Sequence, residues 1–258
     1  MLRYLLVLAL LTPTTALADS KLPFKKELAG DHQLPLPWGI GLDFYTMDQD
    51  YSITDLQFQL PGVSLPDPSQ IAVTNEIQHF DLKGDVWLLP FLNVFAVLGH
   101  VRSDTVVDLS NTAVIGLPIT LPKLPISTNG TVYGGGATVA FGGDKWFGAV
   151  TGTWTHTDLG GDFDSSADTL TAQPRIGLIR GQWVGWVGGM YLDVEEKHSG
   201  NISLPYIGSV PFAVVLDTRE KWNTVAGFRH FFGEHASLSL EIGFGNRTHT
   251  LFNFNYRF

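Results

Sequence analysis

Cysteine is absent from this chain of 258 residues. No disulfide scaffold is therefore available, and no lipid can be attached through a cysteine at a mature N-terminus. Stability must come from apolar burial or from a membrane. Positive charge is also scarce: the formal net charge is -9 at pH 7, which argues against nucleic acid as a partner.

Long apolar runs are missing from most of the chain. Near the start, Arg3, the apolar residues 5–11 and the small-residue pattern Ala-Leu-Ala at 16–18 predict a signal peptide over residues 1–18. Its apolar run is shorter than the roughly 20 residues of a spanning helix and ends at Pro13. After it no apolar stretch reaches that length, so the sequence does not predict membrane helices.

Glycine and aromatic residues are abundant instead. The chain has 28 glycines, and Phe, Trp and Tyr make up 12% of it, whereas charged residues make up 16%. At the C-terminus aromatic and polar side chains alternate: Phe252, Phe254, Tyr256 and Phe258 share one strand face, and Asn253, Asn255 and Arg257 share the other. Such a strand has lipid on one side and water on the other, as in a closed β-barrel.

The same alternation recurs along the chain and predicts about ten antiparallel strands, with eight or twelve as alternative counts. The predicted strands cover residues 38–46, 79–89, 93–104, 133–141, 146–157, 168–179, 183–195, 222–231, 237–244 and 251–258. Their lengths suit tilted membrane strands, which need roughly 9 to 11 residues. The predicted fold is therefore an all-β, closed antiparallel transmembrane barrel over residues 38–258.

Short and long connections alternate between these strands. Short turns fall at residues 90–91, 142–145, 180–182 and 233–235, and long segments at 47–76, 105–130, 158–167 and 196–217. Short periplasmic turns with long extracellular loops are the outer-membrane pattern. The tryptophans lie mostly near predicted strand ends, where girdle residues are expected.

Together the signal peptide, the alternating strands and the terminal Phe258 with Tyr256 two places before it resemble the bacterial outer-membrane β-barrel class. The resemblance covers the chain from about Trp38 onward. It implies a location in the bacterial outer membrane and contact with its lipid. It also implies that the C-terminal aromatic residues Phe254, Tyr256 and Phe258 are the signal read by the barrel-assembly machinery.

Charged side chains share one face of several predicted strands. Because a charge at the lipid face costs about 2–4 kcal/mol, these residues are expected to face the lumen. The predicted lumen residues are Asp43, His79, Asp81, Lys83, Asp85, Arg175, Arg229, Glu241 and Arg257. Two arrangements remain open: an ionic network that fills a narrow interior, or a lumen that conducts small solutes.

Repeated Leu-Pro pairs in the predicted external loops, such as Leu60-Pro61 and Leu117-Pro118, add apolar surface. They are expected to fold over the barrel mouth, packing on one another or forming an apolar funnel. The leading functional hypothesis is a passive channel or uptake route for small solutes, hydrophobic ones included. A structural or adhesive surface barrel is the alternative.

A hydrolase is a further alternative, because His156, His198 and His249 fall near the predicted extracellular rim. The adjoining loops supply Asp158, Asp162, Asp164, Ser165, Ser199 and Asp217. The sequence contains no HExxH, GxSxG or paired-cysteine pattern. We therefore predict no enzyme, no cofactor and no metal site.

The segment between the signal peptide and the barrel, residues 19–37, is expected to lie in the periplasm. Lysines and apolar residues between 21 and 28 are compatible with one short amphipathic helix, and the Leu-Pro-Leu-Pro stretch at 34–37 with an extended chain. The segment either seals the periplasmic opening or is a floppy leader, and the sequence leaves both open.

Overall fold

The structure, a computed structural model, describes residues 21–30, 34–58, 67–68, 71–108, 110, 123–161, 163–204 and 208–258. The predicted signal peptide and most of the Leu-Pro pairs lie outside the described residues. The elements are the 3-10 helix η3 (Lys26–Ala29) and the strands β1 (Trp38–Phe58), β2 (Ala72–Leu89), β3 (Leu92–Asp108), β4 (Lys123–Gly142), β5 (Trp146–Gly160), β6 (Asp164–Arg180), β7 (Trp183–Leu204), β8 (Gly208–Thr218), β9 (Trp222–Phe232), β10 (Ala236–Phe244) and β11 (Thr248–Arg257). No helix in the described part is long and apolar enough to cross a membrane.

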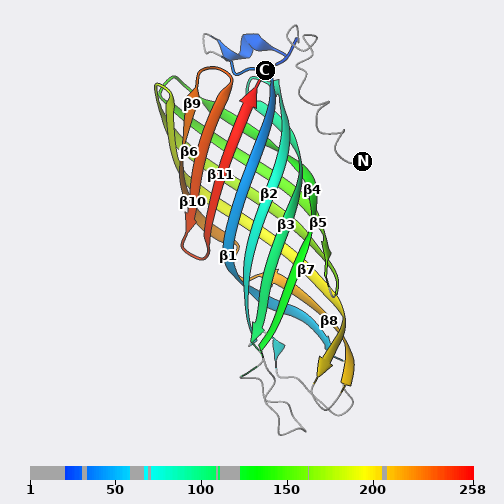
Figure 1. The fold of residues 1–258 in the computed structure, drawn as a ribbon. Coiled ribbons are helices and arrows are strands. Elements are labelled where there is room, and N and C mark those ends of the chain that lie inside the picture. Colours follow the sequence, from blue (N-terminus) through cyan, green and yellow to red (C-terminus); the bar gives the residue numbers. More distant parts are fainter. Residues whose placement is uncertain are drawn as a thin grey trace, which may run out of the picture.

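Ten strands close into a ring, which confirms the predicted barrel. Neighbours pair antiparallel in the order β1 to β7, β9, β10 and β11, and β11 returns to β1 with Gly39 opposite Arg257. Trp38 and Phe258 exchange backbone hydrogen bonds of 3.1 and 3.0 Å at this seam. Figure 1 shows the strands tilted around a common axis, with β11 in red beside β1 in blue. Closure pairs the edge strands with each other, as a barrel in lipid requires.

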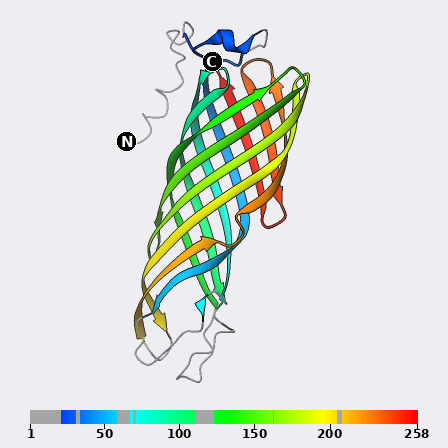
Figure 2. The same ribbon diagram turned by 180° about the vertical axis from the view of Figure 1, so that it is seen from behind.

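The eleventh strand, β8, corrects the prediction, which made residues 196–217 an external loop. Instead β7 continues to Leu204, and the chain returns as β8. β8 pairs with β7, where Asp217 lies opposite Glu195, and with β1, where Asp217 lies opposite Ser52. The short strands β9, β10 and β11 do not pair at this level. The part of the barrel that is farther from the C-terminus, called the distal part below, is therefore an eight-stranded ring of β1 to β8 (Figure 2).

The other loops were also predicted to be longer than they are. Much of 47–76, 105–130 and 158–167 belongs to strands β1 to β6, which extend well beyond the predicted ends. In these extensions apolar and polar side chains still alternate, but the apolar side chains now lie on the inner face of the barrel. The prediction assumed that apolar residues face lipid, so it did not recognise the parts of these strands whose outer face is exposed to water.

The level at which the apolar side chains change from the outer to the inner face marks the edge of the lipid layer on the side away from the short turns. On the side of the short turns, exposed side chains of the ring are apolar, as Phe44 on β1 and Trp154 on β5. Farther out, many of the buried inward residues are apolar, as Ile53 on β1 and Leu159 on β5, and Asp158 is exposed outside. The lipid-facing belt comprises Ile40, Leu42, Phe44, Phe80, Leu82, Leu98, Tyr133, Val139, Phe141, Trp146, Val150, Trp154, Leu170, Ile176, Leu178, Trp183, Val187, Trp222, Phe228, Phe232, Ile242, Phe244, Phe252 and Tyr256.

The tryptophans divide between the two faces. Trp146, Trp154, Trp183 and Trp222 are exposed and belong to the lipid-facing belt. Trp87 and Trp186 instead line the interior. The girdle interpretation was therefore wrong for these two, whose strand parity is that of the lumen residues.

The N-terminal segment lies across the end of the barrel that carries the C-terminus (Figure 1). The Phe24 backbone N–H donates to the Leu88 carbonyl at 2.8 Å, and Arg257 Nε donates to the Leu36 carbonyl at 2.8 Å. Two tethers thus hold residues 21–30 and 34–37 at the end with the short turns. We assign this end to the periplasm.

Arg247 holds the barrel together at the level where ten strands become eight. This buried guanidinium donates to the backbone carbonyls of Glu220 (2.7 Å), Lys221 (3.1 Å) and Met190 (3.2 Å). In return, Asn223 Nδ2 donates to the Arg247 carbonyl at 2.8 Å. These bonds join the β10–β11 turn to β7 and to the β8–β9 connection, where β7 changes its ladder partner.

Replacing Arg247 with methionine is expected to lower the free energy of unfolding by about 2–4 kcal/mol, because buried carbonyls lose their donors. Urea unfolding of the barrel in lipid vesicles, followed by tryptophan fluorescence, measures this change. The matched control is Arg219→Met, since Arg219 is exposed. Equal unfolding midpoints for the two variants would contradict the conclusion that Arg247 stabilises the barrel by joining these segments.

Candidate functional site

A cavity of about 650 Å³ occupies the interior of the barrel. Its wall is built from inward-facing residues, which alternate along each strand with the lipid-facing ones. All nine residues predicted to face the lumen line it: Asp43, His79, Asp81, Lys83, Asp85, Arg175, Arg229, Glu241 and Arg257. The alternation along β1, β2, β6, β9, β10 and β11 thus brings these charges to a single chamber.

Arg175 and Glu241 form a bidentate ion pair across the lumen. Arg175 Nε lies 2.7 Å from Glu241 Oε2, and Arg175 Nη2 lies 2.8 Å from Oε1. Trp186 Nε1 adds a hydrogen bond of 2.6 Å to Oε2, and the Glu241 carboxylate is almost fully buried. The fork geometry suits both groups, so this pair, together with Trp186, joins β6, β7 and β10.

A second ion pair stands at the periplasmic end of the chamber. Arg257 Nη2 lies 2.7 Å from Asp85 Oδ1, and Asn93 Nδ2 donates to the same oxygen at 2.6 Å. Arg257 also donates to the carbonyls of Leu36 and Pro37, at 2.8 and 3.3 Å. The pair therefore links the barrel wall to the segment that crosses the periplasmic end.

The remaining lumen charges have fewer partners. Asp43 accepts a hydrogen bond from Asn253 and lies opposite Asp81 in the β1–β2 ladder. Asp81 lies 3.8 Å from His79 Nδ1. The Lys83 ammonium stands 5.3 Å from the centre of the Phe95 ring, and the buried Arg229 Nε has no hydrogen-bond partner. This wall of the chamber thus presents charges of both signs.

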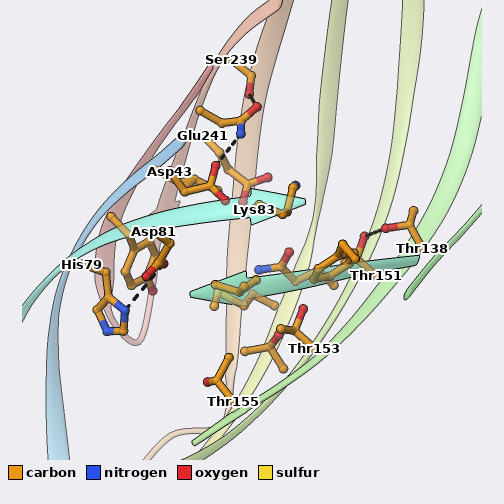
Figure 3. Close-up of a pocket in the computed structure, with 18 of the residues that line it drawn as sticks. Asp43, His79, Asp81, Lys83, Thr138, Thr151, Thr153, Thr155, Ser239 and Glu241 are labelled. Atoms are coloured by element: carbon orange, nitrogen blue, oxygen red, sulfur yellow. Dashed lines mark hydrogen bonds and ion pairs between the residues drawn. The ribbon is translucent and has the colours of Figure 1, made fainter. Parts of the chain in front are cut away.

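Threonines form the facing wall. Figure 3 shows Asp43, His79, Asp81, Lys83 and Glu241 on one side, and across from them a row of hydroxyl side chains from β4 and β5. The labelled hydroxyls are Thr138, Thr151, Thr153 and Thr155. Thr138 and Thr151 are 2.9 Å apart and hydrogen bonded. Hydroxyls can donate or accept, so this wall suits polar groups of either kind.

The chamber changes character toward its distal end. Apolar side chains replace the charges there, among them Met47, Ile77, Val101, Val132, Leu159, Met190, Leu192 and Val194. Tyr51 and Glu196 are among the polar residues that stand between them, and both are nearly fully buried. The sequence analysis placed both in loops and missed them. The signal was the unbroken period of two from Met47 to Ile53 and from Leu192 to His198.

The three rim histidines do not form one site. His156 faces outward just beyond the lipid-facing belt, whereas His198 and His249 are buried. Ser165 Oγ lies 2.7 Å from His198 Nδ1, and His198 Nε2 lies 2.8 Å from Glu196 Oε1. Asp162 lies outside the described residues. Ser165 and His198 are buried and are not part of the chamber wall.

The C-terminal aromatic residues lie at the seam between β11 and β1. Tyr256 and Phe252 are exposed in the lipid-facing belt, and Phe254 is half-buried between them. The Tyr256 ring stacks on His235 with centroids 5.6 Å apart. Phe258 bonds to Trp38 through its backbone and therefore closes the ring.

Removing one partner of the Arg175–Glu241 pair is expected to destabilise the barrel. Glu241→Gln leaves a guanidinium without its counter-charge and lowers the free energy of unfolding by about 3–5 kcal/mol, whereas Arg175→Met with Glu241→Leu restores most of it. Urea unfolding in vesicles measures both changes. Glu234→Gln, in an exposed turn, is the control. A double variant as unstable as the single one would contradict the pairing.

His156 allows a test by pH. It lies beyond the membrane-spanning segment of β5, and its hydrogen bond to Asp168 (2.8 Å), with a second to Asp158, raises the pKa of the imidazole above its ordinary value of about 6.5. A raised pKa means that this pair stabilises the fold fully below pH about 6.5, and the contribution is lost as pH rises through the folded value.

Asp168→Asn is expected to lower the pKa of His156, which an NMR titration of the imidazole signals measures. Asp164→Asn, four residues away on the same strand, is the control. A pKa that stays unchanged in Asp168→Asn would show that the hydrogen bond is not its cause.

No protein-family model matches the chain, and no curated protein matches its sequence. Solved structures resemble it distantly. The transport unit of the autotransporter AIDA-I from Escherichia coli is 7% identical, with 95% of this chain and 97% of that chain covered and a TM-score of 0.42. The β domain of the Bordetella autotransporter BrkA is 11% identical, with 86% and 100% covered and a TM-score of 0.44. The toluene transporter TodX from Pseudomonas putida is 10% identical, with 95% and 92% covered and a TM-score of 0.34. The closed ring and its lipid-facing belt give this chain the architecture of the bacterial outer-membrane β-barrels.

Proposed function

We propose that this barrel is an uptake route that takes a small solute with an apolar body into its lumen. One observation carries the proposal: a cavity of about 650 Å³ remains although nine charged side chains line it. Ion pairs between inward charges, such as Arg175 with Glu241, therefore do not fill the interior. The space that is left is of the size that small-molecule sites have, roughly 300–1,000 Å³.

The polarity of the wall favours a solute that has both an apolar body and polar substituents. Charges and threonines line the periplasmic part of the chamber, and aliphatic side chains line the distal part. An apolar body gains by burial in the distal part, and polar substituents find donors and acceptors below it.

The distal core favours a selective chamber over a wide pore. Beyond the chamber, inward residues such as Ile53, Val73, Val107 and Leu216 are buried and are not part of its wall. Passage from outside therefore requires these side chains or the neighbouring segments to move. We expect low conductance and solute selectivity.

The proposal gives the barrel no catalytic role. Ser165, His198 and Glu196 lie in the order of a hydrolase triad, but the serine is buried and does not reach the chamber wall. The proposed partners are outer-membrane lipid at the belt and the barrel-assembly machinery at Phe254, Tyr256 and Phe258.

Flux through liposomes tests the function. With the mature chain reconstituted, swelling in phenylalanine, a zwitterion that lipid excludes, is expected to be faster than in protein-free liposomes. Thr153→Trp, which places an indole in the chamber, should return the rate to that of protein-free liposomes. Thr131→Trp, on the outer face, should not.

The readout also separates the alternatives. Equal rates in all four preparations, with both variants folded by heat-modified gel mobility, would reject an uptake route and favour a structural surface barrel. A rate lowered equally by Thr153→Trp and Thr131→Trp would show that solute does not pass through the chamber.

A further inference from the structure

The distal end of the chamber is a defined boundary. On each of the strands β1 to β7 the chamber wall ends at one residue. These last wall residues are Tyr51, Ile77, Ser103, Val132, Leu159, Ala167 and Glu196. Ser103 already accepts a hydrogen bond of 2.7 Å from Asn75. Tyr51 and Glu196 are therefore the groups that offer polar atoms to whatever reaches this end.

Glu196 is poorly satisfied by its own protein. Its side chain is 3% exposed, and His198 Nε2 lies 2.8 Å from Oε1, yet the two atoms are not aligned for a hydrogen bond. We take the short distance as an electrostatic contact and not as a formed hydrogen bond, because alignment decides the latter. Each carboxylate oxygen offers about two acceptor sites, and leaving those of the buried Oε1 without an aligned donor is unfavourable.

Tyr51 and Gln49 repeat this pattern beside Glu196. The Tyr51 hydroxyl and both polar atoms of the Gln49 amide are buried, and none of them forms a hydrogen bond of good geometry, although the Tyr51 hydroxyl lies within electrostatic reach of the Glu196 carboxylate and the Gln49 amide. Burial and the neighbouring Glu196 raise the pKa of Tyr51 well above its ordinary value, so the hydroxyl stays protonated. Tyr51 and Glu196, which both line the chamber, thus have hydrogen-bonding capacity that their protein neighbours use only in part.

His198 and Ser165 support the carboxylate from behind. Ser165 Oγ lies 2.7 Å from His198 Nδ1, which fixes the imidazole with Nε2 toward Glu196. Neither residue lines the chamber. Glu196 is the member of this group that faces the chamber, and its position is held by residues on β6 and β7.

We propose that Glu196 and Tyr51 form a recognition site for a protonated amine carried on a small apolar body. The proposal rests on the uptake function and names its solute class. An ammonium supplies several donors to the carboxylate and to the phenol oxygen, and a charge-assisted hydrogen bond is stronger than a neutral one. The surrounding Val132, Leu159 and Val194 bury the apolar body. A carboxylate ligand would instead meet Glu196 with like charge.

Three probes of matched size test this assignment: benzylamine, benzyl alcohol and benzoate. Binding is measured by calorimetry on the mature barrel in lipid nanodiscs, with the signal of empty nanodiscs subtracted. Benzylamine is expected to bind most tightly and benzoate most weakly. Glu196→Gln should weaken benzylamine on the order of tenfold or more and leave benzyl alcohol nearly unchanged. The matched control is Glu195→Gln, the adjacent exposed glutamate on the outer face, which should change nothing.

A second variant keeps the test valid if Glu196→Gln does not fold. Tyr51→Phe retains the ring and is expected to weaken benzylamine by a smaller factor. Equal binding of benzylamine and benzoate, or no binding of any probe because solvent alone satisfies Glu196, would overturn the assignment. Phenylalanine flux without amine preference would refute the site and leave the uptake route intact. Amine binding without phenylalanine flux would refute the uptake route and leave the amine site intact.

Discussion

Closure of the hydrogen-bonded ladder is the constraint on which the rest of this barrel depends. In lipid a strand edge has no water to bond with, so β11 must return to β1. Strands β9 to β11 are too short to follow β1 and β7 beyond the membrane, and the long strands would be left with open edges there. β8 fills this gap by pairing with β7 on one side and β1 on the other. The change from ten strands to eight is thus a consequence of unequal strand length, and Arg247 ties together the backbone at the step.

The polarity of the chamber follows from the surroundings of the same strands. At membrane depth the outer face must be apolar, so the alternate positions are free to be charged or hydroxylated, as Asp43 and Thr153 are. Beyond the membrane the outer face meets water, and stability comes from apolar residues inside, such as Val132 and Leu159. The chamber spans this change. Its polar periplasmic part and apolar distal part are therefore produced by the lipid boundary itself.

The sequence predicted the membrane part well because lipid imposes a simple pattern there. Alternation in the last strand and in residues 79–89 was enough to predict a closed ring and to select charged positions that the structure has at the chamber wall. The distal part escaped prediction for two reasons. In β8 both faces carry apolar residues, for example Val214 beside Val215, so the period is hidden. In β7 consecutive charges such as Glu195 and Glu196 resemble a solvated loop, although they face opposite sides. The contacts between charges depend on strand register, which a single sequence does not supply.

The lumen uses its charges in two ways, and the difference decides which of them can recognise a solute. Arg175 with Glu241, and Arg257 with Asp85, satisfy each other through short hydrogen bonds. A solute gains little by approaching such pairs, because it would have to break bonds that are already good. Their effect is to join strands of the wall: β6 with β10, and β11 with β2. Glu196 differs because its buried Oε1 has no hydrogen bond of good geometry, although His198 Nε2 lies 2.8 Å away. In the proposed uptake route, selectivity therefore belongs to the end of the chamber where the wall has incompletely used hydrogen-bonding groups, and not to the middle, where most charges are paired.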